Sequence, residues 1–175
     1  MKLLPFPDNI QTYDYDCGAK ALQSVLIYYG IEVREDALMK IVHTTKSGTN
    51  PQNIVAAAKK YKLEATASEM NIFDVKGCID REIPVILALQ AWTRKKKIDW
   101  INDWQDGHYV VAIGYDSDRI IFADPASVQR TYLSYDESKK RWHDVDNRGK
   151  KYDHLGIVIF GKKPKFKDDQ LIHMD

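Results

Sequence analysis

Residues 16–30 read DCGAKALQSVLIYYG, and this stretch decides how the first half of the chain folds. Apolar residues within it recur at i, i+3, i+4 and i+7, which is the spacing of one buried face of an α-helix. Gly30 follows at the position where helices commonly end. Cys17 therefore lies at the N-terminus of the predicted helix, where unpaired N–H groups and the helix dipole favour a negatively charged side chain. The apolar face comprises Leu22, Val25, Leu26 and Tyr29.

Three more helices are predicted in the first half of the chain. The apolar spacing of residues 38–42 indicates a short one. Asn50 and Pro51 are typical of an N-cap and a first helical position, and the spacing of a buried face continues to Tyr61. Residues 71–81 begin with an asparagine followed three residues later by an aspartate, which predicts another capped helix start.

The second half of the chain predicts strands. Short apolar runs occupy residues 84–89, 109–115 and 156–160. A polar turn separates the second run from residues 119–123, so these two segments form a predicted hairpin. Residues 134–137 carry a capping-box pattern that indicates one more short helix. Helices followed by mostly antiparallel strands favour an α+β protein over a doubly wound parallel sheet.

Length and composition predict one soluble globular domain. The chain has 175 residues, 44% of them hydrophobic and 29% charged, with a net charge of +1. This balance argues against nucleic acid or a membrane surface as the main partner. No apolar run approaches the roughly 18 residues that a membrane span needs, and prolines interrupt any signal-peptide core. We expect a cytoplasmic protein with a single domain at residues 1–163 and a polar C-terminal tail at residues 164–175.

The cysteines and histidines point away from disulfides and metals. A chain with only Cys17 and Cys78 is most simply read as carrying two free thiols. Cys78 shares a helical stripe with Val75 and Ile79, which predicts a core position. Four scattered histidines show no metal-ligand spacing, and no cofactor is expected. They are His43, His143, His154 and His173.

Four residues far apart in the chain form a candidate catalytic set. His108 opens one strand of the predicted hairpin and Asp124 ends the other, so antiparallel pairing brings them together. A carboxylate there fixes the tautomer of an imidazole that serves a cysteine nucleophile. Gln11, six residues before Cys17, is placed to donate to an oxyanion. Each residue alone also has an ordinary structural reading: a buried thiol, a strand-end histidine, a turn aspartate and a loop glutamine.

Residues 91–106 fit neither the helical nor the strand pattern. They contain three tryptophans and a basic run at residues 94–97. One hypothesis makes the segment a lid or wall of a cleft, with tryptophans such as Trp104 binding substrate. The alternative is an ordinary amphipathic segment that packs Trp100 and Trp104 on the core. The basic run is interpreted as a solvated face.

The chain resembles the bacteriocin-processing, C39-type family of papain-like cysteine peptidases, which cut after a double glycine in leader peptides. The resemblance covers about residues 8–160. It implies a papain-like fold, with N-terminal helices packed on a C-terminal antiparallel sheet, and metal-free peptide cleavage. It also implies that Cys17 is the nucleophile, His108 the base, Asp124 its orienting acid and Gln11 the oxyanion donor. The matching pieces are Gln11, Asp16-Cys17-Gly18, Gly107-His108-Tyr109-Val110-Val111 and Asp124-Pro125.

The substrate is expected to be a peptide or protein, bound by Gly18, Gly107 and Trp104. Gly18 leaves room for a substrate backbone beside the nucleophile. No phosphate-binding G-x-x-x-x-G-K-[ST] motif is present, so we expect a stand-alone domain without a transporter's ATP-binding half. Two alternatives stay open. The same residues could transfer an acyl group to an amine or deamidate a glutamine, or the fold could be a non-catalytic peptide-binding module.

Overall fold

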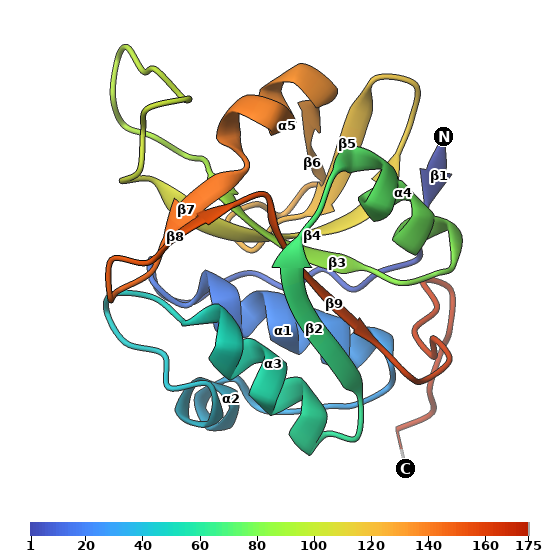
Figure 1. The fold of residues 1–175 in the computed structure, drawn as a ribbon. Coiled ribbons are helices and arrows are strands. Elements are labelled where there is room, and N and C mark those ends of the chain that lie inside the picture. The colour runs from blue at the N-terminus through green and yellow to red at the C-terminus, as the bar shows by residue number, and fades with distance from the viewer. Residues whose placement is uncertain (175) are drawn as a thin grey trace.

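The computed structural model describes residues 1–174 and consists of an antiparallel sheet with helices on both faces (Figure 1). Within these residues the sheet has seven strands in the order β2-β9-β3-β4-β5-β6, and β1 pairs with the far end of β4. A separate two-stranded sheet joins β7 and β8. The elements are β1 (Lys2–Leu3), α1 (Cys17–Tyr28), α2 (Glu35–Ile41), α3 (Pro51–Lys60), β2 (Glu64–Glu69), α4 (Ile72–Asp80), β3 (Val85–Gln90), β4 (Gly107–Tyr115), β5 (Arg119–Ala123), β6 (Thr131–Ser134), α5 (Tyr135–Arg141), β7 (His143–Val145), β8 (Lys151–Asp153) and β9 (Leu155–Phe160).

Helix α1 is the central helix of the core. With α2 and α3 it covers one face of the sheet, whereas α4 and α5 lie on the other face (Figure 1). The predicted apolar face of α1 is fully buried, and the Tyr29 hydroxyl donates to the Ile159 carbonyl oxygen at 2.8 Å. Gly30 adopts φ +76°, a left-handed conformation that suits glycine at a helix end. The α+β fold class, with N-terminal helices on an antiparallel sheet, is confirmed.

The predicted helix starts are confirmed by their hydrogen bonds. Asn50 accepts from the Gln52 N–H at 2.9 Å, with Pro51 in the first turn of α3. At α4, Asn71 accepts from the Asp74 N–H at 3.1 Å and Asp74 accepts from the Asn71 N–H at 2.9 Å. The start of α5 has the same reciprocal arrangement. Local sequence therefore specifies where these helices begin.

The separation of helices from strands is less complete than the sequence indicates. Strand β2 lies between α3 and α4, inside the half predicted to be helical, and pairs along its length with β9. Its sequence EATASE contains one residue that favours strands, Thr66, and its only apolar residues are two alanines, so the pattern is too weak to predict a strand. Strands β1, β6, β7 and β8 are also absent from the prediction, since they are only two to four residues long.

The predicted C-terminal tail begins against the helical layer. The N–H groups of Lys165 and Phe166 both donate to the Tyr28 carbonyl oxygen, at 2.9 and 3.2 Å. Residue 175 lies outside the described residues. In residues 1–174 no helix has the length and apolar character required to span a membrane.

The capping box of α4 gives a stability test. Asn71→Ala removes the acceptor for the Phe73 and Asp74 N–H groups. We expect the free energy of unfolding in urea to fall by about 1 kcal/mol. Gln129→Ala, in an exposed loop, is the control and should change it by less than about 0.5 kcal/mol. Equal effects would mean that α4 is held by packing alone.

Candidate active site

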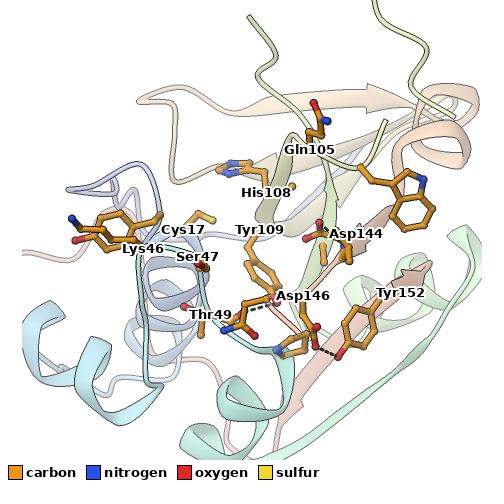
Figure 2. Close-up of a pocket in the computed structure, with 18 of the residues that line it drawn as sticks. Cys17, Lys46, Ser47, Thr49, Gln105, His108, Tyr109, Asp144, Asp146 and Tyr152 are labelled. Carbon is orange, nitrogen blue, oxygen red and sulfur yellow. Dashed lines mark hydrogen bonds between the residues drawn. The ribbon is translucent and has the colours of Figure 1, made fainter. Parts of the chain in front are cut away.

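The N-terminus of α1 packs against the start of β4. A Cβ atom on Gly18 would lie 3.0 Å from both the Tyr109 ring and the Thr49 Cβ, so a larger residue would push the helix and the strand apart by a few tenths of an ångström. Cys17 and His108 then line one cavity of about 290 Å³ (Figure 2). Their side chains are almost enclosed, at 8% and 7% exposed.

The hairpin of β4 and β5 joins His108 to Asp124. The two strands pair through Val111 and Ala123, which places the end of β5 beside the start of β4. His108 Nε2 lies 2.7 Å from Asp124 Oδ1. This contact leaves Nδ1 as the ring nitrogen available to Cys17, which is the arrangement that a thiol–imidazole–carboxylate triad requires.

Asp124 is held as a carboxylate by several donors. Besides His108, its oxygens accept from the Ala126 N–H at 2.8 Å, the Trp92 indole N–H at 3.0 Å and the Thr131 hydroxyl at 3.2 Å. Burial by itself raises the pKa of Asp124, but the hydrogen bond and charge of His108, with these further donors, hold the pKa below its ordinary value. The group therefore stays ionised at neutral pH.

The environment of His108 favours the protonated ring. Burial by itself lowers the pKa of His108. The hydrogen bond to Asp124, and then the hydrogen bonding and charge of Cys17, outweigh that effect and raise the pKa to about 9. An imidazolium between a carboxylate and a sulfur nucleophile is the charge state from which a cysteine protease begins its reaction.

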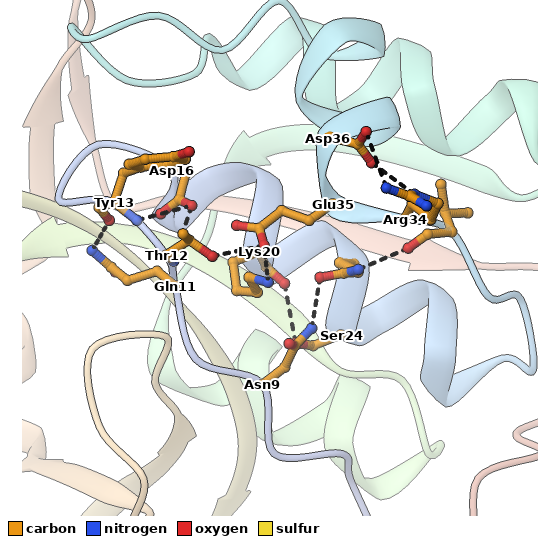
Figure 3. Close-up of polar contacts among 12 residues, drawn as sticks. Asn9, Gln11, Thr12, Tyr13, Asp16, Lys20, Ser24, Arg34, Glu35 and Asp36 are labelled. Carbon is orange, nitrogen blue, oxygen red and sulfur yellow. Dashed lines mark hydrogen bonds and ion pairs between the residues drawn. The ribbon is translucent and has the colours of Figure 1, made fainter.

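The backbone of Gln11 lies close to the triad of Cys17, His108 and Asp124. Its N–H donates to the Pro125 carbonyl oxygen at 2.9 Å, next to Asp124. Its side-chain amide donates to the Tyr13 carbonyl oxygen at 2.7 Å (Figure 3). Gln11 is not among the residues that line the cavity with Cys17 and His108, and its amide oxygen is enclosed without a partner. The role of Gln11 as an oxyanion donor stays a prediction.

Comparison with known proteins then gives the family. Residues 7–145 match the sequence model of the Peptidase C39 family. The chain belongs to this family. The agreement covers the segments that carry Gln11, Cys17, His108 and Asp124.

Several members of the family are similar in sequence or fold. The pediocin PA-1 transport/processing ATP-binding protein PedD of Pediococcus acidilactici is 29% identical over 136 residues, which are 77% of this chain and 17% of that protein. An uncharacterised protein of Methanothermobacter thermautotrophicus is 27% identical over 117 residues, 67% of this chain and 70% of that protein. The peptidase domain of Streptococcus ComA, a bifunctional ABC transporter of a quorum-sensing pathway, superposes with a TM-score of 0.66 at 26% identity, over 92% of this chain and 98% of that one.

Two of the three predicted substrate-binding residues of this C39 domain, Gly107 and Trp104, line the cavity, and Gly18 does not. Gly18 is buried, packs closely against Tyr109 and Thr49 and is not among the residues that line the cavity; its contact with substrate stays a prediction. Gly107 does line the cavity, and a Cβ atom there would collide with the carboxylate of Asp144. Trp104 lines it too, with its ring centroid 4.4 Å from that of His143.

The segment 91–106 has no helix or strand and turns back on itself. The Ala91 N–H donates to the Asp106 carbonyl oxygen at 2.9 Å, and Lys95 pairs with both Asp103 and Asp106. The rest of the basic run is exposed, in agreement with a solvated face. Through Trp104 and Gln105 the segment forms part of the cavity wall (Figure 2).

Trp92 is a contact of the triad that the sequence does not reveal. It lies two residues after the end of β3, which pairs with β4 so that Leu89 lies opposite His108. The Trp92 side chain is 57% exposed, yet its indole N–H reaches Asp124, and its backbone adopts φ +58°. A left-handed conformation is unfavourable for an aromatic residue. The hydrogen bond from the Trp92 indole to the ionised Asp124 carboxylate offsets part of that strain.

Asp144 is a second residue that the sequence analysis missed. It belongs to β7, which is too short to predict, and lines the cavity with Cys17 and His108. Its Oδ1 accepts from the Val145 N–H at 2.8 Å and from the Gln90 amide at 3.2 Å. Burial raises the pKa of Asp144 to about 6, so the group is mostly ionised above neutral pH.

A buried carboxyl pair supports the loop in front of α1 (Figure 3). Asp16 directly precedes α1 and is fully buried, and one of its oxygens accepts from the N–H groups of Thr12 and Tyr13 at 3.1 and 3.2 Å, so it does not cap the helix with its side chain. Its carboxyl meets that of Glu35, which pairs with Lys20 at 2.9 Å. Burial first, and the hydrogen bond to Glu35 second, raise the pKa of Asp16 to about 6. The pair therefore shares a proton below that pH.

Neither Cys78 nor any of the remaining histidines lines the cavity, although His143 packs against Trp104, which does. Both cysteines are free, and Cys78 is buried in the core as predicted. Over residues 1–174 no group of three or more His, Cys, Asp or Glu side chains could hold a metal ion.

The shared proton of Asp16 predicts a change in the pH dependence of stability. A carboxyl group with a raised folded-state pKa stabilises most at low pH, and that contribution is lost as the pH rises through the folded pKa. Asp16→Asn fixes a neutral group that can accept from Thr12 and Tyr13 and donate to Glu35. Between about pH 4 and about pH 7 we expect the urea unfolding free energy to fall less in this variant than in the wild type.

The control for this experiment is Asp168→Asn, in the exposed tail, which removes the same charge. It should keep the wild-type slope of stability against pH. A wild-type slope in Asp16→Asn as well would contradict the shared proton.

The indole of Trp92 gives a second test. Trp92→Phe keeps an aromatic ring but removes one donor to an ionised acceptor. We expect the free energy of unfolding in urea at neutral pH to fall by about 1–2 kcal/mol. Trp100→Phe is the matched control, because the Trp100 indole N–H donates to no residue among 1–174. An equal loss in the two variants would mean that Trp92 only covers the site.

Proposed function

We propose that this member of the Peptidase C39 family is a cysteine peptidase that cleaves a peptide through Cys17, His108 and Asp124. The observation that carries the proposal is the 2.7 Å contact of His108 Nε2 with Asp124 Oδ1, made by a histidine that shares a cavity with Cys17. Family membership supports peptidase chemistry. The co-occurrence of all three residues in one site argues against a module that only binds peptides.

The reaction follows from the positions of these groups. The Cys17 thiolate attacks the scissile carbonyl carbon, a carbon–sulfur bond forms, and the carbonyl oxygen becomes an oxyanion. N–H groups at the start of α1 stabilise that charge, and the Gln11 amide is the proposed second donor once its side chain turns from Tyr13 toward the cavity. His108 protonates the leaving amine as the carbon–nitrogen bond breaks. It then takes a proton from the water that releases the acyl group, while Asp124 holds the ring in place.

The substrate is proposed to be a peptide lying in the cavity between α1 and β4. The structural neighbours include a double-glycine-motif protease of an AMS/PCAT transporter solved with its leader peptide, with a TM-score of 0.63 and 18% identity, which supports the fold. Residues from both layers line the cavity, among them Gly48 and Thr49 before α3 and Gly107 at the start of β4. An extended backbone needs such a groove beside the nucleophile.

Alkylation of Cys17 tests the thiolate–imidazolium pair. We expect iodoacetamide at about pH 6 to modify Cys17 in the wild type at least about tenfold faster than in His108→Ala, because the imidazolium stabilises the thiolate. Peptide mass spectrometry separates this modification from that of Cys78. Equal rates in the two proteins would remove the basis of the proposed mechanism.

Turnover of a peptide panel, followed by product masses, then completes the test. Cys17→Ala should abolish cleavage, and Cys78→Ala, in the core, should leave it unchanged. Asp124→Asn should retain more activity than His108→Ala, since its amide oxygen still accepts from His108. Its amide nitrogen meets the Trp92 and Thr131 donors, so part of the activity is lost. Products that carry an added amine, or a lost one, would indicate acyl transfer or deamidation in place of hydrolysis.

A further inference from the structure

A second cavity, of about 140 Å³, is lined by Asp124 but by neither Cys17 nor His108. In the sheet Leu89 lies opposite His108, and Val110 is two residues further along the same strand as His108. Side chains of a strand alternate between its two faces, so this lining occupies the face that carries the triad histidine. The second cavity is therefore a separate space next to the triad carboxylate. Four neighbouring strands supply its apolar lining, with Leu89 from β3, Val110 from β4, Phe122 from β5 and Leu133 from β6.

Arg141, the last residue of α5, brings a cation to the second cavity without a matching acceptor. Its Nε is enclosed and has no hydrogen-bond partner among residues 1–174. Its two terminal nitrogens donate to none of these residues either, and they are not among the enclosed, unpartnered atoms. The guanidinium therefore has hydrogen-bond donors that remain for a ligand.

The contacts that Arg141 does make leave its charge only partly balanced. Its ion pair with Glu137 is long, at 3.6 Å, and the other Glu137 oxygen accepts from Ser134. The guanidinium carbon lies 3.9 Å from the centre of the Trp100 ring, which covers one face of the cation. Burial lowers the pKa of Arg141, because the surroundings replace too little of the lost water. A carboxylate placed in the cavity would supply the missing acceptor.

Asp124 lines the second cavity, but its acceptor positions are already used. Its two oxygens accept four hydrogen bonds, one of them from the imidazolium of His108. A carboxylate has about four acceptor positions, so none remains for a donor on a ligand. The same four donors balance its charge, which reduces its repulsion of a negative group beside Arg141. The polar residues of the cavity thus favour an anion over a cation.

We propose that the second cavity binds a small carboxylic acid whose apolar body is about the size of one aromatic ring, with its carboxylate on Arg141. A planar guanidinium suits a carboxylate, which it binds through two parallel hydrogen bonds. The volume sets the size of the body, since an apolar cavity of about 150 Å³ holds one benzene molecule. This site lies outside the catalytic cavity, so the proposal does not depend on peptide cleavage.

Two exposed aromatic side chains give a ligand access to the second cavity. Trp92 and Tyr132 both line it, and they are 57% and 58% exposed. Trp92 and Thr131 line it as well as donating to Asp124. A bound acid would therefore touch two of the groups that hold the triad carboxylate.

The experiment measures the affinity of the full chain for four small compounds by isothermal titration calorimetry at about pH 7, where carboxylic acids are ionised. Phenylacetate has both the ring and the negative charge. Phenylacetamide keeps the ring and loses the charge, acetate keeps the charge and loses the ring, and phenethylamine carries the opposite charge. We expect phenylacetate to bind at least about tenfold more tightly than each of the other three, because it alone pairs with Arg141 and fills the cavity.

Two variants separate the charge from the space. Arg141→Met keeps an unbranched side chain against Trp100 but removes the cation, and it should weaken phenylacetate binding about tenfold. Ala91→Leu adds volume at the wall of the cavity while Arg141 stays, and it should weaken phenylacetate binding by at least as much. Arg94→Met, at an exposed position of the same segment as Ala91, removes the same charge and should keep the wild-type affinity.

Nuclear Overhauser contacts in the wild type locate the ligand. The ring protons of phenylacetate should contact the methyl groups of Leu89, Val110 and Leu133. Contacts only with methyl groups elsewhere overturn the inference.

Equal affinity of the wild type for phenylacetate and phenylacetamide also overturns it, without any variant. Equal affinity for acetate overturns it as well, since the apolar space would then contribute nothing. Tighter binding of phenethylamine overturns it in favour of Asp124 as the group that selects the ligand. Phenylacetate affinity that Arg141→Met or Ala91→Leu leaves unchanged overturns it too.

Discussion

The close contact of α1 with β4 is the constraint on which the site depends. Gly18 has no side chain, so the first turn of the helix rests directly on the Tyr109 ring, and the Tyr109 hydroxyl donates to the Thr49 carbonyl oxygen at 3.0 Å. Tyr109 is the neighbour of His108 on the strand. The same packing therefore sets the position of the thiol relative to the imidazole, and it also ties the loop before α3 to the cavity.

The site also contains more buried ionisable groups than a protein core ordinarily holds. Each of them has a specific partner. Donors around Asp124 hold a negative charge next to His108, whereas Asp16 and Glu35 share one proton below about pH 6 and so avoid a second negative charge there. Desolvation raises the pKa of Asp144, which has the fewest partners. Of these groups His108 and Asp144 line the cavity itself, and groups with perturbed pKa values in a cavity are typical of functional sites.

The segment 91–106 shows how irregular structure completes such a site. Trp92 supplies a hydrogen bond to the carboxylate of the triad, and Trp104 supplies part of the wall of the cavity. Lys95 draws the segment together through two aspartates, so the basic run stabilises the loop that carries both tryptophans. A segment between two paired strands can take these roles because its two ends are fixed by β3 and β4.

The sequence by itself determined the features that depend on local spacing. Helix starts follow from the capping residues Asn50, Asn71 and Ser134, and the pairing of His108 with Asp124 follows from a short hairpin, whose register is a local property. Only the tertiary structure decided which segments far apart in the sequence lie next to each other. Strand β2 exists because β9 offers it an edge, and Asp144 faces the nucleophile because β7 lies beside Gln90 and Gly107. Such placements depend on contacts between residues tens of positions apart, and no periodicity in the sequence records them.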